Sequence, residues 1–148
     1  MQVLVQKIER SQPEQAVIKC HGVTDKVNSI VNFIKSADAS LLGYAGERMT
    51  ELFVTDIFYV EAVDNRVFAY TNNKTYLLRV KLYEFEEAHK FMRFFRCSKS
   101  MVVNLMKIDS VYPIFNGRFS AKLFNGEEII ISRRYVSELK KLLGGDEA

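Results

Sequence analysis

The sequence predicts an α+β protein that is mainly β, in which short antiparallel sheets are stacked with two helices and an N-terminal extension is added. Three observations predict this fold class. From residue 41 onward, hydrophobic runs of strand length alternate with turn residues. Two segments of helical periodicity interrupt those runs. The regular alternation of strand and helix that is typical of a parallel sheet is missing.

The first 40 residues predict a strand-strand-helix extension. Residues 2–9 alternate between apolar and polar, as a half-buried strand does, and residues 15–21 predict a second strand. Thr24 is a favourable N-cap for a helix over 24–35, where apolar residues recur at helical spacing. Small and polar residues end this unit. We therefore expect two domains, an extension at 1–40 for dimerisation or partner binding and a second domain at 41–148, which carries the segments of family resemblance described below.

The second unit begins as a meander of antiparallel strands. Residues 41–53 and 56–63 predict strands, and the pair Asp64-Asn65 predicts a tight turn before the next one. Residues 72–74 predict a further turn. Neighbouring strands joined by such short turns pair with each other, so we expect a sheet of hairpins.

Two asparagine-glycine pairs predict hairpins later in the chain. Asn116-Gly117 and Asn125-Gly126 predict two-residue turns, in which both residues need a positive φ. Pro113 cannot donate to a strand ladder, so its strand is expected at an edge or a bulge.

Two helices are expected among these strands. Residues 81–92 place apolar side chains on one face and acids on the other. A second helix is expected after Ser132 as its N-cap, with Gly144 as its stop.

Composition and targeting signals limit the class of protein. The chain has 148 residues and a formal net charge of +3, so global charge alone does not identify a partner. Cys20 and Cys97 are too few for a disulfide scaffold, and reduced thiols are expected. No secretion signal and no apolar run of about 18 residues is present, so we expect a cytoplasmic protein.

The sequence offers no catalytic constellation. His21 and His89 lie in different segments, and we expect both on the surface. No glycine-rich phosphate loop, nucleophile elbow or closely spaced Cys/His pair is present. The acids at 84–87 are interpreted as a solvated helix face. We therefore expect no enzyme activity, cofactor, metal or small-molecule substrate.

One segment is basic in a chain whose charges nearly balance. No acid occurs from His89 through Ile108, and five basic residues do: Lys90, Arg93, Arg96, Lys99 and Lys107. These residues have a plain interpretation as solubilising side chains between a helix and a strand.

A second basic feature favours an anionic partner. Arg133 and Arg134 occupy the expected first turn of the last helix. Cations are unfavourable at this end of the helix dipole by a few tenths of a kcal/mol each. Free N–H groups and two guanidinium groups together make a strong anion site, so this position indicates binding of an anion.

Three segments resemble the LytTR-type DNA-binding domain family. They are FFRCSKSMVVNLMKIDSV at 94–111, IIISRRYVSELKKLL at 129–143 and DIFYVEAVDNRVFAY at 56–70. They occur in the family's order, and the resemblance covers about residues 45–143. It implies a bacterial transcription regulator that is built of short antiparallel sheets and two helices. It also implies that loops at one edge of the stack, rather than a recognition helix, enter successive major grooves.

The resemblance assigns DNA contacts to three elements. They are the turn with Asn65 and Arg66, the loop with Ser98, Lys99 and Ser100, and the turn with Ser132, Arg133 and Arg134. Many relatives carry His at the position of Asn65, and their turn is longer. Asn still has the geometry to bond an adenine edge in bidentate fashion.

The basic segment is then interpreted as facing phosphates. Arg93, Arg96 and Lys99 are expected to neutralise backbone charge. Asn104 and Glu61 are interpreted as structural residues. For Cys97, one hypothesis is a redox-active thiol whose pKa is lowered by Arg96 and Lys99, and the other is a small buried residue.

The resemblance also suggests partners. The first 40 residues are too short for the receiver domain of many relatives, so the chain is similar to stand-alone members. We expect a homodimer on direct repeats of double-stranded DNA. A membrane-protein inhibitor is a further candidate partner, since stand-alone members are often paired with one. The alternative function is a protein-interaction module of the same fold, with weak DNA affinity.

Overall fold

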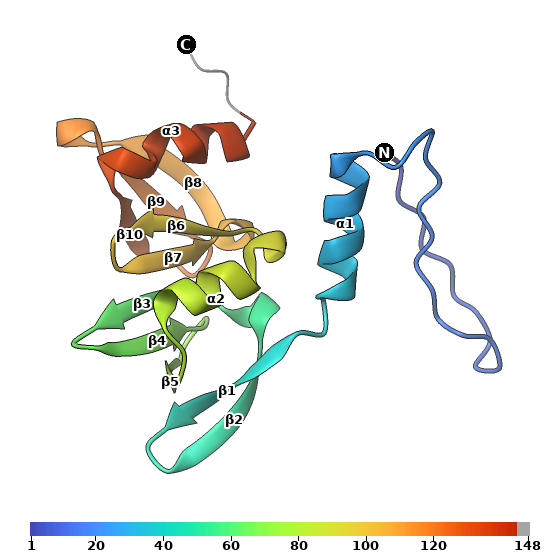
Figure 1. Ribbon diagram of the computed structural model, residues 1–148, viewed down its shortest axis with the longest axis horizontal. Coiled ribbons are helices and arrows are strands. Elements are labelled where there is room, and N and C mark those ends of the chain that lie inside the picture. The colour runs from blue at the N-terminus through green and yellow to red at the C-terminus, as the bar shows by residue number, and fades with distance from the viewer. Residues whose placement is uncertain (145–148) are drawn as a thin grey trace.

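A computed structural model describes residues 1–144, which form two antiparallel sheets and three α-helices (Figure 1). The larger sheet has the strand order β2-β1-β5-β4-β3-β7-β6, and the smaller has the order β10-β9-β8. The predicted fold class, mainly β with α, is confirmed. The strands are β1 (Ser40–Ala45), β2 (Arg48–Phe53), β3 (Tyr59–Val63), β4 (Arg66–Tyr70), β5 (Thr75–Leu78), β6 (Phe94–Ser98), β7 (Met101–Asn104), β8 (Ile108–Pro113), β9 (Phe119–Leu123) and β10 (Glu128–Ile131). The helices are α1 (Asp25–Lys35), α2 (Leu82–Ala88) and α3 (Arg133–Leu142).

Two hydrophobic cores lie on opposite faces of the central strands. Val60 of β3 and Val102 of β7 pack with Phe85 of α2 in the first core. Val103 of β7 packs with Leu139 of α3 and the small sheet in the second. Successive side chains of a strand point to opposite faces, so β7 contributes to both cores through adjacent residues. These strands are therefore buried on both sides.

Asn104 ties the end of β7 to the start of β3. It is buried, its side-chain amide donates to the carbonyl oxygen of Ile57 at 2.9 Å, and its side-chain oxygen accepts from the Met106 N–H at 3.0 Å. Its backbone N–H donates to the Phe58 carbonyl oxygen at 2.9 Å. The geometry matches the structural role expected for Asn104.

The β3–β4 turn is formed as the sequence predicts. Asp64 and Asn65 have φ values of 51° and 63°, so both adopt the left-handed conformation of a two-residue hairpin. The preceding residues also form a hairpin, since the segment 41–53 divides into β1 and β2 around Gly46, whose φ is 61°. The turn predicted at 72–74 is present, closed by a bond from the Thr71 N–H to the Lys74 carbonyl oxygen.

The two asparagine-glycine turns are longer than predicted. Asn116 and Gly117 have positive φ, but the Ile114 N–H donates to the Arg118 carbonyl oxygen, so three residues lie between the paired positions. At the second turn Gly126 has a φ of 89° and Asn125 has no positive φ, so that part of the prediction is wrong. A three-residue loop needs the left-handed conformation only at its last residue, which explains the difference. Pro113 ends β8 at an edge of the small sheet, as predicted.

The helices also differ in detail from the predictions. α2 ends at Ala88 rather than near residue 92, because a 3-10 turn and a left-handed Arg93 (φ 64°) follow it. His89, expected on the surface, is half-buried beside the Phe85 ring at 4.6 Å, and burial lowers the pKa of its imidazole. α3 begins after Ser132 and ends before Gly144, as predicted.

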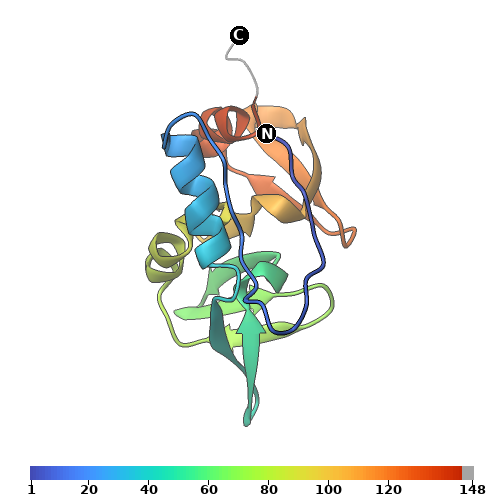
Figure 2. The ribbon, with the colours of Figure 1, turned by 90° about the vertical axis from the view of Figure 1, so that its right-hand side faces the viewer.

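Residues 1–23, which we call the arm, form no strand in the single chain. The predictions of strands at 2–9 and 15–21 are therefore wrong for the isolated molecule, whereas α1 forms with Thr24 as its N-cap. In the described part of the chain, one backbone hydrogen bond lies within the arm, from the Gln12 N–H to the Glu9 carbonyl oxygen. Figure 1 shows the arm beyond α1, apart from both sheets, and Figure 2 shows the same arm from its own side, in front of the rest of the molecule. A strand needs a partner for its backbone groups, and none of residues 1–144 pairs with the arm as a strand.

We predict that Asn104→Leu lowers the free energy of unfolding by about 1–3 kcal/mol, because the Ile57 carbonyl and the Met106 N–H lose their buried partners. Urea unfolding followed by circular dichroism measures this change. Asn73→Ala, in the exposed turn before β5, is the control and should change little. Equal effects of the two substitutions would show that Asn104 does not hold the two strand ends together.

Candidate nucleic-acid interface

Three loops meet at one edge of the molecule, on the left in Figure 1: the β3–β4 turn, the β6–β7 loop and the β10–α3 junction. Two backbone hydrogen bonds hold them together. The Ala62 N–H donates to the Ser100 carbonyl oxygen, and the Ser132 N–H donates to the Cys97 carbonyl oxygen, each at 2.8 Å. The elements that the resemblance selected for DNA contact are therefore neighbours in space.

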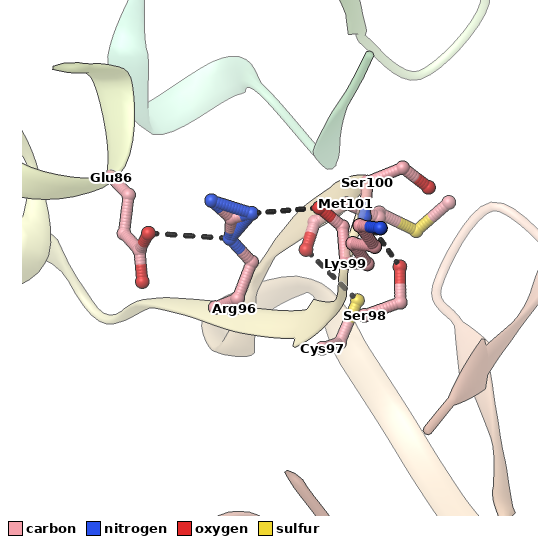
Figure 3. Close-up of polar contacts among 7 residues, drawn as sticks. All are labelled: Glu86, Arg96, Cys97, Ser98, Lys99, Ser100 and Met101. Carbon is pink, nitrogen blue, oxygen red and sulfur yellow. Dashed lines mark hydrogen bonds and ion pairs between the residues drawn. The ribbon is translucent and has the colours of Figure 1, made fainter. Parts of the chain in front are cut away.

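The β6–β7 loop is braced from inside by Arg96 (Figure 3). Its Nε donates to Glu86 of α2 at 3.2 Å, and its Nη1 donates to the Lys99 carbonyl oxygen at 2.9 Å. The Ser98 hydroxyl accepts from the Ser100 N–H at 3.3 Å. The Arg96 side chain is only 20% exposed, so it positions the loop instead of extending toward a phosphate as expected.

The acid-free segment obtains its counter-charges from α2. Lys90 pairs with Glu87 at 2.9 Å, and Arg96 pairs with Glu86. Arg93 lies at the opposite end of β6 from the loop, where its guanidinium donates to the Leu142 carbonyl oxygen at 3.3 Å. The structure therefore does not bring Arg93 to the three loops.

Lys99 is the residue of this segment that faces solvent at the loop. It is exposed, and its side chain has no polar partner among residues 1–144. Lys107, by contrast, lies 5.1 Å from the centre of the Phe58 ring. The charge argument from the sequence therefore applies to Lys99 and not to the whole segment.

The start of α3 carries two exposed arginines. Arg133 and Arg134 lie in its first turn, and neither forms an ion pair with an acid in the described part of the chain. The Arg134 guanidinium lies 5.5 Å from the Tyr135 ring centre. The Arg133 stem packs over Gly117, where an added Cβ would lie 2.8 Å from the arginine Cδ. The helix N–H groups and the two arginines thus lie at the same end of α3.

A fourth loop beside α3 was missed from the sequence. In the β8–β9 loop, the Arg118 guanidinium lies 4.8 Å from the ring centre of Phe115, which is 73% exposed. The Arg118 Nε is buried without a hydrogen-bond partner among the described residues. The asparagine-glycine pair indicated only a turn. The signal that could have found this site is an arginine directly after that turn and an aromatic residue before it.

The β3–β4 turn is the least basic of the loops. Asn65 and Arg66 are exposed, as a reading contact requires, but Asp64 adds a negative charge beside them. This turn is therefore better suited to hydrogen bonding with base edges than to neutralising phosphates.

Cys97 is buried behind the loop. Its side chain is fully buried, and this burial raises the pKa of the thiol to about 12, against a smaller lowering by Arg96. The thiol therefore stays protonated near neutral pH, which favours the interpretation as a small buried residue over a redox-active thiol.

Two other features are absent from residues 1–144. These residues contain no group of three or more His, Cys, Asp or Glu side chains that could hold a metal ion. Within the same range, each helix is too short or too polar to cross a membrane.

Comparisons with known proteins place these loops in a family. Residues 47–144 match the model of the LytTr DNA-binding domain. The chain is 29% identical to the transcriptional regulatory protein YpdB of Escherichia coli K12, over 95% of this chain but only 54% of YpdB. It is 31% identical to an uncharacterized HTH-type transcriptional regulator of Staphylococcus aureus NCTC 8325, over 82% of this chain and 83% of that protein.

A solved structure agrees with the sequence matches. The LytTr DNA-binding domain of a putative methyl-accepting/DNA response regulator from Bacillus cereus superposes with a TM-score of 0.67 at 28% identity. The superposition covers 71% of this chain and 96% of the Bacillus cereus chain. The family model spans most of the chain, and the solved LytTr structure shares its fold. The chain therefore belongs to the LytTr DNA-binding domain family.

Proposed function

We propose that the protein is a sequence-specific DNA-binding transcription regulator that reads major grooves through loops at one edge of its sheets. The observation that carries this proposal is the convergence of three loops with exposed cations on one edge, held by the Ala62–Ser100 and Ser132–Cys97 backbone bonds. Membership of the family and the names of the relatives support it.

The packing of α3 limits which of its residues can reach DNA. Val136 and Leu139 of α3 are buried in the second core, so this face of the helix is unavailable to a groove. Arg133 and Arg134 are exposed in its first turn, directly after Ser132, whose N–H bonds the β6–β7 segment at Cys97. The first turn of α3 therefore acts together with the loops in the proposed interface.

Different residues of the loops contact the DNA backbone and the base edges in this proposal. Lys99, Arg118 and Arg133 contact phosphates, and the hydroxyls of Ser98 and Ser100 add hydrogen bonds to the backbone. Arg134 reads a guanine edge and Asn65 an adenine edge, which are the pairings their geometry favours. Arg66 completes the positive charge at the β3–β4 turn. Arg93 and Arg96 make no DNA contact in this scheme.

The assembly that we propose is a cytoplasmic homodimer on direct repeats of double-stranded DNA. A membrane protein that restrains it is a further partner of the same proposal. The alternative, an interaction module of this fold with weak DNA affinity, finds less support, because the exposed arginines of α3 lie without acidic partners in residues 1–144.

DNA binding is predicted to weaken steeply with salt. Lys99, Arg118 and Arg133 give three phosphate contacts per protomer, so log K against log salt should slope by about −3. Fluorescence anisotropy at several salt concentrations measures the slope. Lys35→Ala, at the end of α1, is the control and should leave it unchanged. A flat salt dependence would contradict the electrostatic basis of the proposal.

Phosphate and base contacts are predicted to separate by substitution. Lys99→Ala should weaken binding to all DNA sequences alike and reduce the salt slope by about 1. Arg134→Ala should cost about 1–3 kcal/mol on the operator and much less on random DNA. Titrations on both DNAs give these values. An equal loss on both DNAs for Arg134→Ala would make Arg134 a backbone contact.

Arg96→Ala is predicted to weaken DNA binding without changing the salt slope, because Arg96 braces the loop and neutralises no phosphate. Glu86→Gln removes the charge of its partner and should reproduce part of the loss. The same anisotropy titrations measure both. A slope reduced by about 1 for Arg96→Ala would instead restore Arg96 as a phosphate contact.

A further inference from the structure

The arm, residues 1–23, exposes apolar side chains that no other part of the described chain covers. Val5 is 94% exposed. The other large apolar residues exposed in the arm are Met1, Val3, Leu4, Ile8, Val17 and Val23. Single exposed apolar residues are ordinary, but seven within one short segment mark an interaction surface.

The backbone groups of the arm, like its apolar side chains, have few partners within the described chain. Residues 2–9 and 15–21 carry a strand pattern in the sequence, yet neither forms a strand, and a single backbone bond at Glu9 and Gln12 closes the turn between them. A segment with strand-forming residues and free backbone groups is a template for pairing with another strand. The sequence pattern therefore favours strands that the single chain does not form, and pairing with another strand would allow them to form.

A second copy of the chain supplies the matching partner. Two arms related by a twofold axis present each other with the same apolar side chains and the same free backbone groups. The arm has three basic residues, Lys7, Arg10 and Lys19, and two acidic ones, Glu9 and Glu14, so two arms repel each other little. An arm so nearly neutral is poorly suited to nucleic acid or to an anionic membrane.

The size and place of the arm fit a dimer. A standard protein interface uses about 20–30 residues on each side, and the arm offers a segment of this length. It lies beyond α1, whereas the DNA-contacting loops lie at the opposite edge in Figure 1. Pairing through the arms therefore leaves the loops of both copies free.

We propose that two copies of the chain join through their N-terminal arms, in which residues 2–9 and 15–21 become strands of an intermolecular antiparallel sheet. The consequence for DNA rests on the proposed function: the paired arms link two DNA-binding domains. Binding of one domain then raises the effective concentration of the second at a neighbouring repeat.

Sedimentation of the full-length chain tests the interface. The wild type should sediment as a dimer, and Val5→Asp should sediment as a monomer whose circular dichroism stays that of a folded domain, because Val5 is solvent-exposed in the single chain. Met49→Asp, also at an exposed apolar residue but on β2, is the matched control and should stay dimeric. A monomeric wild type, or a dimeric Val5→Asp, overturns the proposal.

Amide hydrogen exchange tests the strands themselves. Amides of residues 2–9 and 15–21 should be protected in the wild-type dimer and lose their protection in Val5→Asp. A dimer in which these amides exchange freely overturns the proposal, since the two copies then meet elsewhere. Protection of the same amides in a monomer would show that the arm folds onto its own chain, which also overturns it.

Titration on DNA with one repeat or two separates this proposal from the proposed function. Val5→Asp should bind one repeat as the wild type does and lose the advantage on two repeats, by about 10²-fold or more. An undiminished advantage on two repeats overturns the proposed link between domains. If the wild type binds neither DNA, the proposed function fails, while sedimentation and hydrogen exchange still decide whether the arms pair.

Discussion

Burial of β3 and β7 on both faces is the constraint on which the rest of the structure depends. Val102 belongs to one core and Val103 to the other, so a shift of β7 by one residue would exchange the two packing surfaces. Asn104 fixes that register through its bonds to Ile57 and Met106. The loops of the candidate interface extend directly from these strands or from elements bonded to them, which gives them a rigid base.

The cations of this protein fall into two groups according to their surroundings. Arg96 is half-buried and must satisfy its charge within the molecule, so Glu86 and a loop carbonyl hold it in place. Lys99 leaves its charge in solvent and available to a partner. The same sequence segment thus contains Arg96, which holds the β6–β7 loop in place, and Lys99, the exposed cation of that loop. Under the proposed function, substitutions of these two residues should weaken DNA binding for different physical reasons.

Local signals in the sequence predicted the elements that depend on local chemistry. The Asp64-Asn65 turn and the Gly144 stop require a left-handed backbone, which few residues adopt, so their identity indicates their conformation. The partner of Arg96 could not be predicted, because Glu86 approaches it only through the packing of α2 on the sheet. The prediction of strands in the arm was wrong for a related reason, since strand formation depends on a partner that lies outside the local sequence. The neighbourhood of Arg118 and α3 likewise exists only in the folded chain.

The contact between Gly117 and Arg133 links two loops that the sequence keeps apart. Gly117 has a positive φ and no room for a Cβ beneath the arginine stem, so any larger residue there must displace Arg133. The reach of an arginine at the tip of α3 is thus set by a glycine on another loop. With Arg133 as the proposed phosphate contact, DNA affinity has an evolutionary route through a position that itself touches no DNA, and a selection for altered affinity should randomise Gly117 together with Arg133.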